Sequence, residues 1–127
     1  MMKYYVDTCI WRDYWENRSD GLRPLGEFAF QFLKNLNRDD VILVSDVVVD
    51  ELLKYYDSKT IAEMLTITTQ IIRVSISAEE YARAKLMRNA PSIPLGDAMH
   101  QIIAEREHAI IVTRDKHFIS RRLPEEL

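Results

Sequence analysis

The segment Ala109-Ile110-Ile111-Val112-Thr113-Arg114-Asp115 is a short apolar run that closes with an acid, and Lys3-Tyr4-Tyr5-Val6-Asp7 closes in the same way. A run of β-branched and aromatic residues that stops at a polar residue is typical of a buried strand. In an open α/β sheet the ligand crevice lies at the carboxyl ends of the strands. The sequence therefore predicts that Asp7 and Asp115 are both delivered to such a crevice.

Strand and helix patterns alternate along the rest of the chain. Apolar runs predict two more strands, at residues 41–44 and 71–76. Apolar side chains at helical spacing predict helices near residues 10–15 and over 25–36, 45–56, 58–65, 77–88 and 97–107, with Ser45 and Ser58 as N-caps and Ser77 with Glu80 as a capping box. This order predicts an α/β fold with a mainly parallel central sheet of four or five strands and helices on both faces. The C-terminal segment is short, so the pattern leaves the presence of a last edge strand open.

Length and composition limit the class of protein. With 127 residues, 47% of them hydrophobic and 29% charged, the chain fits one globular domain over residues 1–127. No apolar stretch reaches the roughly 18 residues of a membrane helix, and Asp7 cuts the first apolar run too short for a signal peptide. The single Cys9 cannot form an internal disulfide, which favours a cytoplasmic location. The net charge of −3 is unusual for a nucleic-acid binder, but divalent cations bound to the acids would offset it.

Two further acids interrupt apolar helical patterns. Glu51 shares a helix face with Val47 and Tyr55, so its carboxylate is expected at the edge of the buried stripe, where an ion needs a partner. A salt bridge to a Lys or Arg is the alternative explanation. Asp97 lies in the first turn of its helix, where the alternative is a favourable interaction with the helix dipole.

Asp7 and Asp115 also have alternative roles, as helix or turn caps. Four acids that all lie near strand ends or helix starts are nevertheless hard to explain by capping alone. Their oxygen atoms suit Mg²⁺ or Mn²⁺. Zinc fits poorly because Cys9 is alone and the histidines show no short ligand spacing. We expect His100 and His108 to be surface or helix-end residues rather than ligands.

Four short motifs follow one another along the chain. They are Val6-Asp7-Thr8, then Ser45-Asp46-Val47-Val48-Val49-Asp50-Glu51-Leu52, then Leu95-Gly96-Asp97-Ala98 with Ile102-Ile103-Ala104, and finally Thr113-Arg114-Asp115-Lys116-His117-Phe118. Each is weak alone, but their order and spacing resemble those of the PIN-domain ribonucleases, specifically the VapC-type toxins of toxin–antitoxin pairs. The resemblance covers nearly the whole chain. One departure is His117, where many relatives have an acid or Asn, and this leaves the number of metal ions open.

The resemblance implies a three-layer PIN-like fold and metal-dependent cleavage of RNA. The catalytic residues, which would bind Mg²⁺ or Mn²⁺, are Asp7, Glu51, Asp97 and Asp115. The substrate-binding residues would be Thr8, Thr113, Arg12 and Lys116, with Arg114 as a further candidate for the RNA backbone. Members of the family usually form homodimers and bind a cognate antitoxin protein.

Three aromatic residues bear on those partners. Trp11 and Trp15 are expected in the core because they recur at helical spacing. Phe30 lies off the main apolar stripe of its helix and is expected to be exposed, where it would suit a protein interface.

Other functions stay open at this point. A non-catalytic PIN-like module would bind RNA or protein without cutting, and an RNA-processing nuclease would act outside any toxin system. A receiver domain also has acids at strand ends, but it needs an acidic pair after the first strand, where this chain has Thr8 and Cys9. An aspartate-nucleophile phosphatase needs a second Asp at the position of Cys9.

Overall fold

The computed structural model describes residues 1–87, 93–115, 118 and 121–127. Within these residues the sheet has five strands in the order β3-β2-β1-β4-β5, and every neighbouring pair is parallel. The strands are β1 (Lys3–Val6), β2 (Val41–Ser45), β3 (Ile71–Val74), β4 (Ile110–Val112) and β5 (Arg121–Arg122). The predicted α/β fold with a parallel central sheet is confirmed.

The edge strand β5 answers the question that the sequence left open. Arg121 pairs with Ile111 and Arg122 with Val112, and the backbone N–H of Thr113 donates to the carbonyl of Arg122 at 2.8 Å. A two-residue strand made of arginines has no apolar period to detect. Its conformation is set by the hydrogen-bonding edge of β4 rather than by local propensity.

Helices connect the strands. They are α1 (Thr8–Glu16), α2 (Leu25–Lys34), α3 (Asp46–Leu52), α4 (Ser58–Met64), α5 (Ala78–Met87) and α6 (Leu95–Arg106), with 3₁₀ turns η1 (Leu65–Ile67) and η2 (Pro124–Glu126). The capping box is confirmed: the Ser77 N–H donates to Glu80 Oε1 at 2.9 Å, and the Glu80 N–H donates to Ser77 Oγ at 3.1 Å. Within the described ranges, none of the helices has both the length and the hydropathy of a membrane span.

The helix predicted over residues 45–56 is wrong at its C-terminal end. It stops at Leu52, and a turn separates it from α4. The N-cap of α4 is Asp57 instead of the predicted Ser58, because its carboxylate accepts the Thr60 N–H at 2.8 Å. The extended backbone of Asp57 cannot continue a helix, so α4 starts afresh after the turn that follows α3.

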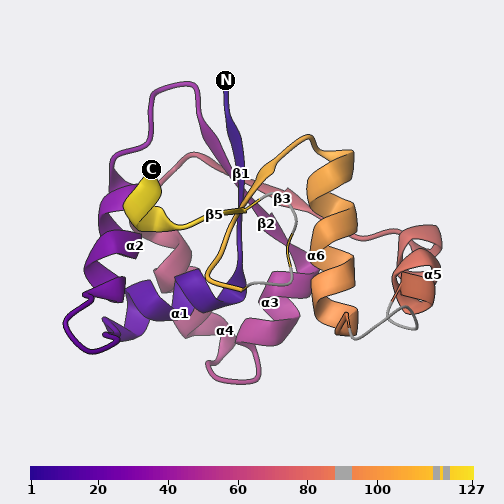
Figure 1. The fold of residues 1–127 in the computed structure, drawn as a ribbon, viewed down its shortest axis with the longest axis horizontal. Helices are drawn as coiled ribbons and strands as arrows, with labels where there is room; N and C mark the ends of the chain where they lie inside the picture. The colour runs from indigo at the N-terminus through magenta and orange to yellow at the C-terminus, as the bar shows by residue number, and fades with distance from the viewer. Residues whose placement is uncertain (88–92, 116–117, 119–120) are drawn as a thin grey trace.

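The helices lie on both sides of the sheet, with α1 and α2 on one side and α5 and α6 on the other (Figure 1). The connections from β1 to β2 and from β2 to β3 run in one direction across the sheet, whereas the connection from β3 to β4 runs in the opposite direction. Because crossovers between parallel strands are right-handed, helices in the two kinds of connection cover opposite faces. Successive side chains of a strand also point to opposite faces of the sheet. Tyr4 packs edge-on against Phe32 of α2, with ring centroids 5.1 Å apart, whereas Tyr5 packs against His100 of α6 at 5.3 Å.

Very short connections bring helix starts to the carboxyl edge of the sheet. Only Asp7 separates β1 from α1, and β2 runs directly into α3. Both junctions are capped, because Asp7 accepts the Thr8 N–H at 2.8 Å and Ser45 Oγ accepts the Val48 N–H at 3.1 Å. The first turn of α6 lies at the same edge (Figure 1).

Gly26 lies where α2 meets the end of α1. A Cβ atom at residue 26 would lie 2.5 Å from Asn17 Cα and 2.7 Å from the carbonyl oxygen of Asp13. Because these are backbone atoms, the two helices must separate to admit a methyl group. We expect Gly26→Ala to lower the free energy of unfolding by about 1–3 kcal/mol, as measured by urea denaturation. The control is Lys34→Ala, an exposed change on the same helix that should cost no more than about 0.5 kcal/mol. Equal losses in the two variants would contradict the close approach.

Candidate metal centre

A cavity of about 240 Å³ opens at the carboxyl edge of the sheet. Its lining residues come from β1, α1, α3 and α6 and the segments beside them: Asp7, Thr8, Cys9, Arg12, Glu51, Lys54, Tyr55 and Asp97. Three of the four acids proposed from the sequence, Asp7, Glu51 and Asp97, therefore line one cavity.

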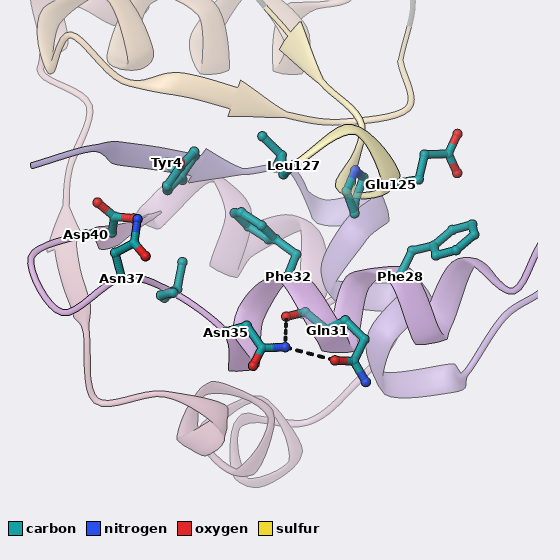
Figure 2. A pocket seen from close by; sticks show the side chains of 11 residues that line it. Tyr4, Phe28, Gln31, Phe32, Asn35, Asn37, Asp40, Glu125 and Leu127 are labelled. Atoms are coloured by element: carbon teal, nitrogen blue, oxygen red, sulfur yellow. Dashed lines mark hydrogen bonds between the residues drawn. The ribbon is translucent and has the colours of Figure 1, made fainter.

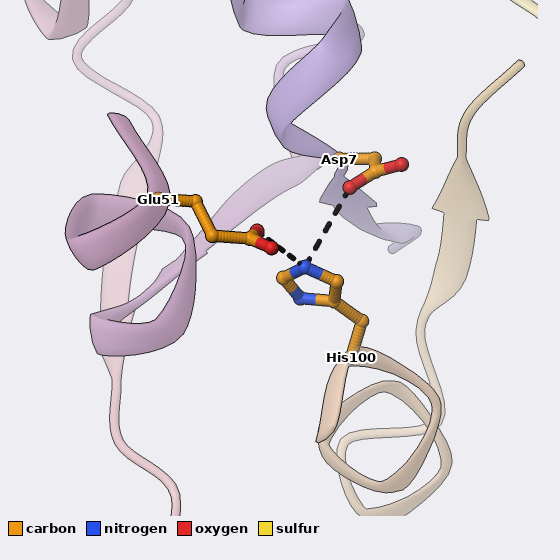
Figure 3. A group of neighbouring side chains, drawn as sticks. All are labelled: Asp7, Glu51 and His100. Atoms are coloured by element: carbon orange, nitrogen blue, oxygen red, sulfur yellow. Dashed lines mark hydrogen bonds and ion pairs between the residues drawn. The ribbon is translucent and has the colours of Figure 1, made fainter. Parts of the chain in front are cut away.

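The side chains of Asp7, Glu51 and His100 converge beside this cavity (Figure 3). Each contributes one potential ligand atom, and these atoms all lie within 4.8 Å of one another. His100 Nε2 is 2.7 Å from Glu51 Oε1 and 3.7 Å from Asp7 Oδ1. Among the described residues, neither Asp97 nor Asp115 belongs to this close group.

Asp7 is held by three neighbours. It caps α1 through Oδ1, as the alternative reading of the sequence expected, while Thr113 Oγ1 donates to its Oδ2 at 2.7 Å. The Cys9 thiol lies 3.5 Å from the same Oδ2. Burial raises the pKa of Cys9 to about 12, so the thiol keeps its proton and can donate to Asp7. Capping and metal binding are thus compatible roles for Asp7.

Glu51 accepts two hydrogen bonds on one oxygen. Thr8 Oγ1 and His100 Nε2 both lie 2.7 Å from Oε1. Burial favours the neutral carboxyl, but the hydrogen bond and charge of His100 and the Thr8 hydroxyl outweigh it, so the pKa of Glu51 falls below its ordinary value. Glu51 therefore stays ionised, and its ion-pair partner in the described part of the chain is His100 rather than a Lys or Arg.

The expectation for His100 is wrong: its side chain is 1% exposed and lies inside the site. The sequence spacing in α6 could have indicated this position, since His100 follows Asp97 by one helical turn and precedes the buried Ile103 and Ala104 by another. Burial alone would lower the pKa of His100, but hydrogen bonding to Glu51 and the negative charges around it raise it above its ordinary value. His108, at the end of α6, is exposed as expected.

Asp97 and Asp115 are placed differently. Asp97 is half-buried in the first turn of α6, and it lines the cavity. Asp115 follows β4, and its backbone N–H donates to Thr113 Oγ1 at 2.9 Å, the same hydroxyl that donates to Asp7. Thr113 thus ties the segment of Asp115 to the Asp7 carboxylate.

The basic residues proposed to contact the RNA backbone differ in their surroundings. The Arg12 guanidinium lies on the cavity wall, 3.7 Å above the Tyr55 ring, with Nε 3.1 Å from Glu16. Arg114 instead makes a bidentate ion pair with buried Asp13, which occupies the guanidinium. Lys116 and His117 lie outside the described residues. The sequence analysis did not single out Lys54, which lines the cavity as well.

A second cavity, of about 400 Å³, is lined by none of Asp7, Glu51 and Asp97 (Figure 2). It lies between α2, η2 and the amino-terminal half of β1, where Tyr4 and Phe32 pack together. Its Asn35 amide is satisfied by Gln31, which accepts at 2.8 and 2.9 Å. Because the acids lie at the opposite ends of the strands, this cavity is separate from the candidate metal centre.

Carboxylates that converge in this way require a counter-charge. Asp7 and Glu51 offer oxygen ligands beside the imidazole of His100, and Asp97 lines the same cavity. Such a donor set fits Mg²⁺ or Mn²⁺. Fold and site together define a parallel α/β domain with a candidate divalent-metal centre at the carboxyl edge of its sheet.

The chain belongs to the PIN domain family, whose model matches residues 4–122. That range includes the four motifs found in the sequence, and the three-layer PIN-like fold is confirmed. A comparison with curated protein sequences returned no match.

The fold is also similar to solved toxin–antitoxin structures. A chain of a toxin–antitoxin complex from Klebsiella pneumoniae has a TM-score of 0.65 and 20% identity, with 100% of both chains covered. VapC20 of Mycobacterium tuberculosis, a toxin that cleaves the sarcin-ricin loop, has a TM-score of 0.69 and 14% identity over 94% of this chain and 99% of that one. A chain of VapBC2 from Rickettsia felis, bound to promoter DNA, has a TM-score of 0.62 and 21% identity over 90% and 89%. At these identities the likeness concerns the fold.

Proposed function

We propose that this chain is a metal-dependent endoribonuclease of the VapC type, folded as one PIN domain over residues 1–127. The observation that carries the proposal is the convergence of Asp7 and Glu51 at the carboxyl edge of the sheet, with Asp97 lining the same cavity. Membership of the PIN domain family supports it independently. A cytoplasmic location is part of the proposal, since its RNA substrates are found there.

The metal would be Mg²⁺ or Mn²⁺, held by Asp7, Glu51, Asp97 and Asp115. When bound, such a cation lowers the pKa of a coordinated water toward about 7 and offsets charge on the phosphate. Hydrolysis by in-line attack of water would leave a 5′-phosphate and a 3′-hydroxyl.

The remaining residues of the site position ligands and substrate. Thr113 orients Asp7 through its 2.7 Å hydrogen bond, and Thr8 orients Glu51 in the same way. Arg12, stacked on Tyr55 at the rim, is suited to an RNA phosphate because an arginine presents several donors in a fixed plane. Lys116 is proposed for the same purpose from its sequence position.

We also propose that the protein is the toxin of a toxin–antitoxin pair and forms a homodimer. Two of the similar solved structures, those from Klebsiella pneumoniae and Rickettsia felis, are toxin–antitoxin complexes, which supports an antitoxin partner. Exposed aromatic surface suits these interfaces. Trp11 is fully buried as expected, but Trp15 is 37% exposed, and half-buried Phe30 stacks on Tyr14 with ring centroids 6.2 Å apart. Light scattering that gives a monomer at high concentration would exclude the dimer.

The nuclease assignment predicts a metal-dependent activity that Asp97→Asn removes. Purified protein should cleave one or more of tRNA, rRNA and mRNA with Mn²⁺ but not with EDTA, and Asp97→Asn should lose this activity. The matched control is Asp39→Asn, the same change at an exposed acid at the amino end of β2, which should retain full activity. Cleavage that persists in EDTA would overturn the proposal, whereas no cleavage of any RNA with Mn²⁺ would favour a non-catalytic binding module.

The toxin role has a separate test. Expression of the unaltered chain in bacteria should arrest growth, and expression of Asp97→Asn should not. Cleavage without growth arrest would favour an RNA-processing nuclease outside any toxin system.

A further inference from the structure

The imidazole of His100 is buried beside the acids of the candidate metal centre and is hydrogen-bonded on both sides. It is 1% exposed, and both ring nitrogens have partners. Nε2 contacts Glu51 Oε1 at 2.7 Å, and Nδ1 lies 2.5 Å from the Tyr5 hydroxyl, which in turn lies 2.6 Å from Ser45 Oγ. A buried chain of hydrogen bonds therefore runs from the end of β2 through β1 and α6 to an acid of the candidate metal centre.

The two oxygens of Glu51 have different surroundings. Oε1 is occupied by two donors, His100 and Thr8. Oε2 faces the start of α6, where a Cβ atom at Gly96 would lie 2.9 Å from it. Fixing Oε1 therefore directs Oε2 toward the helix turn that carries Asp97.

An ionised Glu51 can only accept, so Nε2–H of His100 donates to it whether or not the ring is charged. In the neutral ring Nδ1 accepts from the Tyr5 hydroxyl, and in the charged ring Nδ1–H donates to the Tyr5 oxygen, so Tyr5 holds the imidazole in both states. Burial raises the pKa of Tyr5 strongly, so this phenol keeps its proton. Its own oxygen can accept from Ser45, whose Oγ also caps α3. Packing of the ring against Tyr5 further limits rotation of the imidazole.

We propose that His100, held by Tyr5 and Ser45, is a positioning residue that locks Glu51 Oε1 and presents Oε2 to the metal. This inference rests on the proposed function, in which Glu51 is a metal ligand. Partners that orient a ligand typically contribute about 10–100-fold to metal affinity or activity. We therefore expect metal affinity, rather than RNA affinity, to depend on the chain from Ser45 to His100.

The test compares Tyr5→Phe, His100→Ala and His100→Gln with the control Tyr4→Phe. Tyr4→Phe removes the same hydroxyl from the adjacent residue, whose ring faces α2 instead of α6. The dissociation constants for Mn²⁺ and Mg²⁺ are measured without RNA by calorimetry, and the free energy of unfolding is measured in EDTA. We expect a weakening of about 10–100-fold for both ions in His100→Ala. The loss should be smaller in Tyr5→Phe and His100→Gln, because each keeps part of the hydrogen-bond chain, and Tyr4→Phe should not change the affinity.

Four other results would overturn this inference, the proposed function or both. Unchanged dissociation constants in His100→Ala, with only the unfolding free energy reduced, would reduce His100 to a packing role and overturn the inference. A loss confined to Mn²⁺ would overturn it in favour of direct ligation, because an imidazole ligand discriminates between Mn²⁺ and Mg²⁺. Unaltered protein that binds neither ion would overturn both proposals. Unaltered protein that binds Mn²⁺ through this chain but cleaves no RNA would overturn the proposed function alone.

Gly96→Ala tests the position of Glu51 Oε2 directly, and it replaces His100→Ala if that variant does not fold. The added methyl group would displace Glu51 Oε2, the end of a flexible side chain, so the backbone need not shift and the loss of stability in EDTA should be smaller than in His100→Ala. Metal affinity should fall, since Glu51 cannot move without breaking its bonds to His100 and Thr8. Unchanged metal affinity in Gly96→Ala would contradict a fixed role for Oε2.

Discussion

Asp7→Asn is expected to slow cleavage of RNA by at least about a hundredfold, because partners that only orient a metal ligand already contribute 10–100-fold. The substitution keeps the shape of the side chain and removes its charge. The single amide oxygen of Asn can still cap α1 in place of Oδ1, while its N–H₂ group takes the place of Oδ2 and faces the Thr113 hydroxyl, which can turn to accept. The fold should therefore be retained. The loss should therefore appear in metal binding and catalysis, not in folding.

Three measurements separate these effects for Asp7→Asn. The rate of cleavage at saturating Mn²⁺ should fall, and so should the rise in melting temperature that Mn²⁺ causes in the unaltered protein. The melting temperature in EDTA should not fall, since the variant relieves repulsion between Asp7 and Glu51. Asp39→Asn again serves as the control. Full activity in Asp7→Asn would exclude Asp7 from the site, and a large loss of stability in EDTA would show that its charge is structural.

Arg114→Leu is expected to lower the free energy of unfolding by about 3 kcal/mol, because loss of one partner leaves a buried charge uncompensated. Asp13 is 1% exposed, and Arg114 contacts both of its oxygens, at 2.7 and 2.8 Å. These hydrogen bonds raise the pKa of Arg114, so the pair stays charged. Arg18, 3.2 Å from Asp13, compensates part of the loss and keeps the expected value at the low end for buried pairs.

Urea denaturation would measure this loss, with Arg38→Leu in an exposed turn as the control. The control should change the free energy of unfolding by no more than about 0.5 kcal/mol. The double variant Asp13→Leu with Arg114→Leu should regain part of the stability, since it leaves no unpaired carboxylate. If Arg114→Leu were as stable as the control, Asp13 would have to be satisfied by Arg18 alone.

The sequence predicted the positions of the strands and the convergence of three of the acids because both follow from local pattern. Apolar runs that end at an acid located β1 and β4 correctly, and parallel strands carry their carboxyl ends to one edge. Asp7, Glu51 and Asp97 reach one cavity for that reason. The helix over residues 45–56 failed because one apolar period spans both α3 and the turn that follows.

What the sequence by itself determined was the parallel α/β fold, the family and the edge of the sheet at which the acids gather. Tertiary structure alone decided the roles of His100 and Asp13. Tyr5 and His100 are 95 residues apart in the chain, Glu51 and His100 49, and Asp13 and Arg114 101. Periodicity reports which face of an element is buried, but the partner that a buried polar group finds depends on how distant elements pack. The sequence therefore predicted a surface or helix-end position for His100, and only the fold showed that it lies between Tyr5 and Glu51.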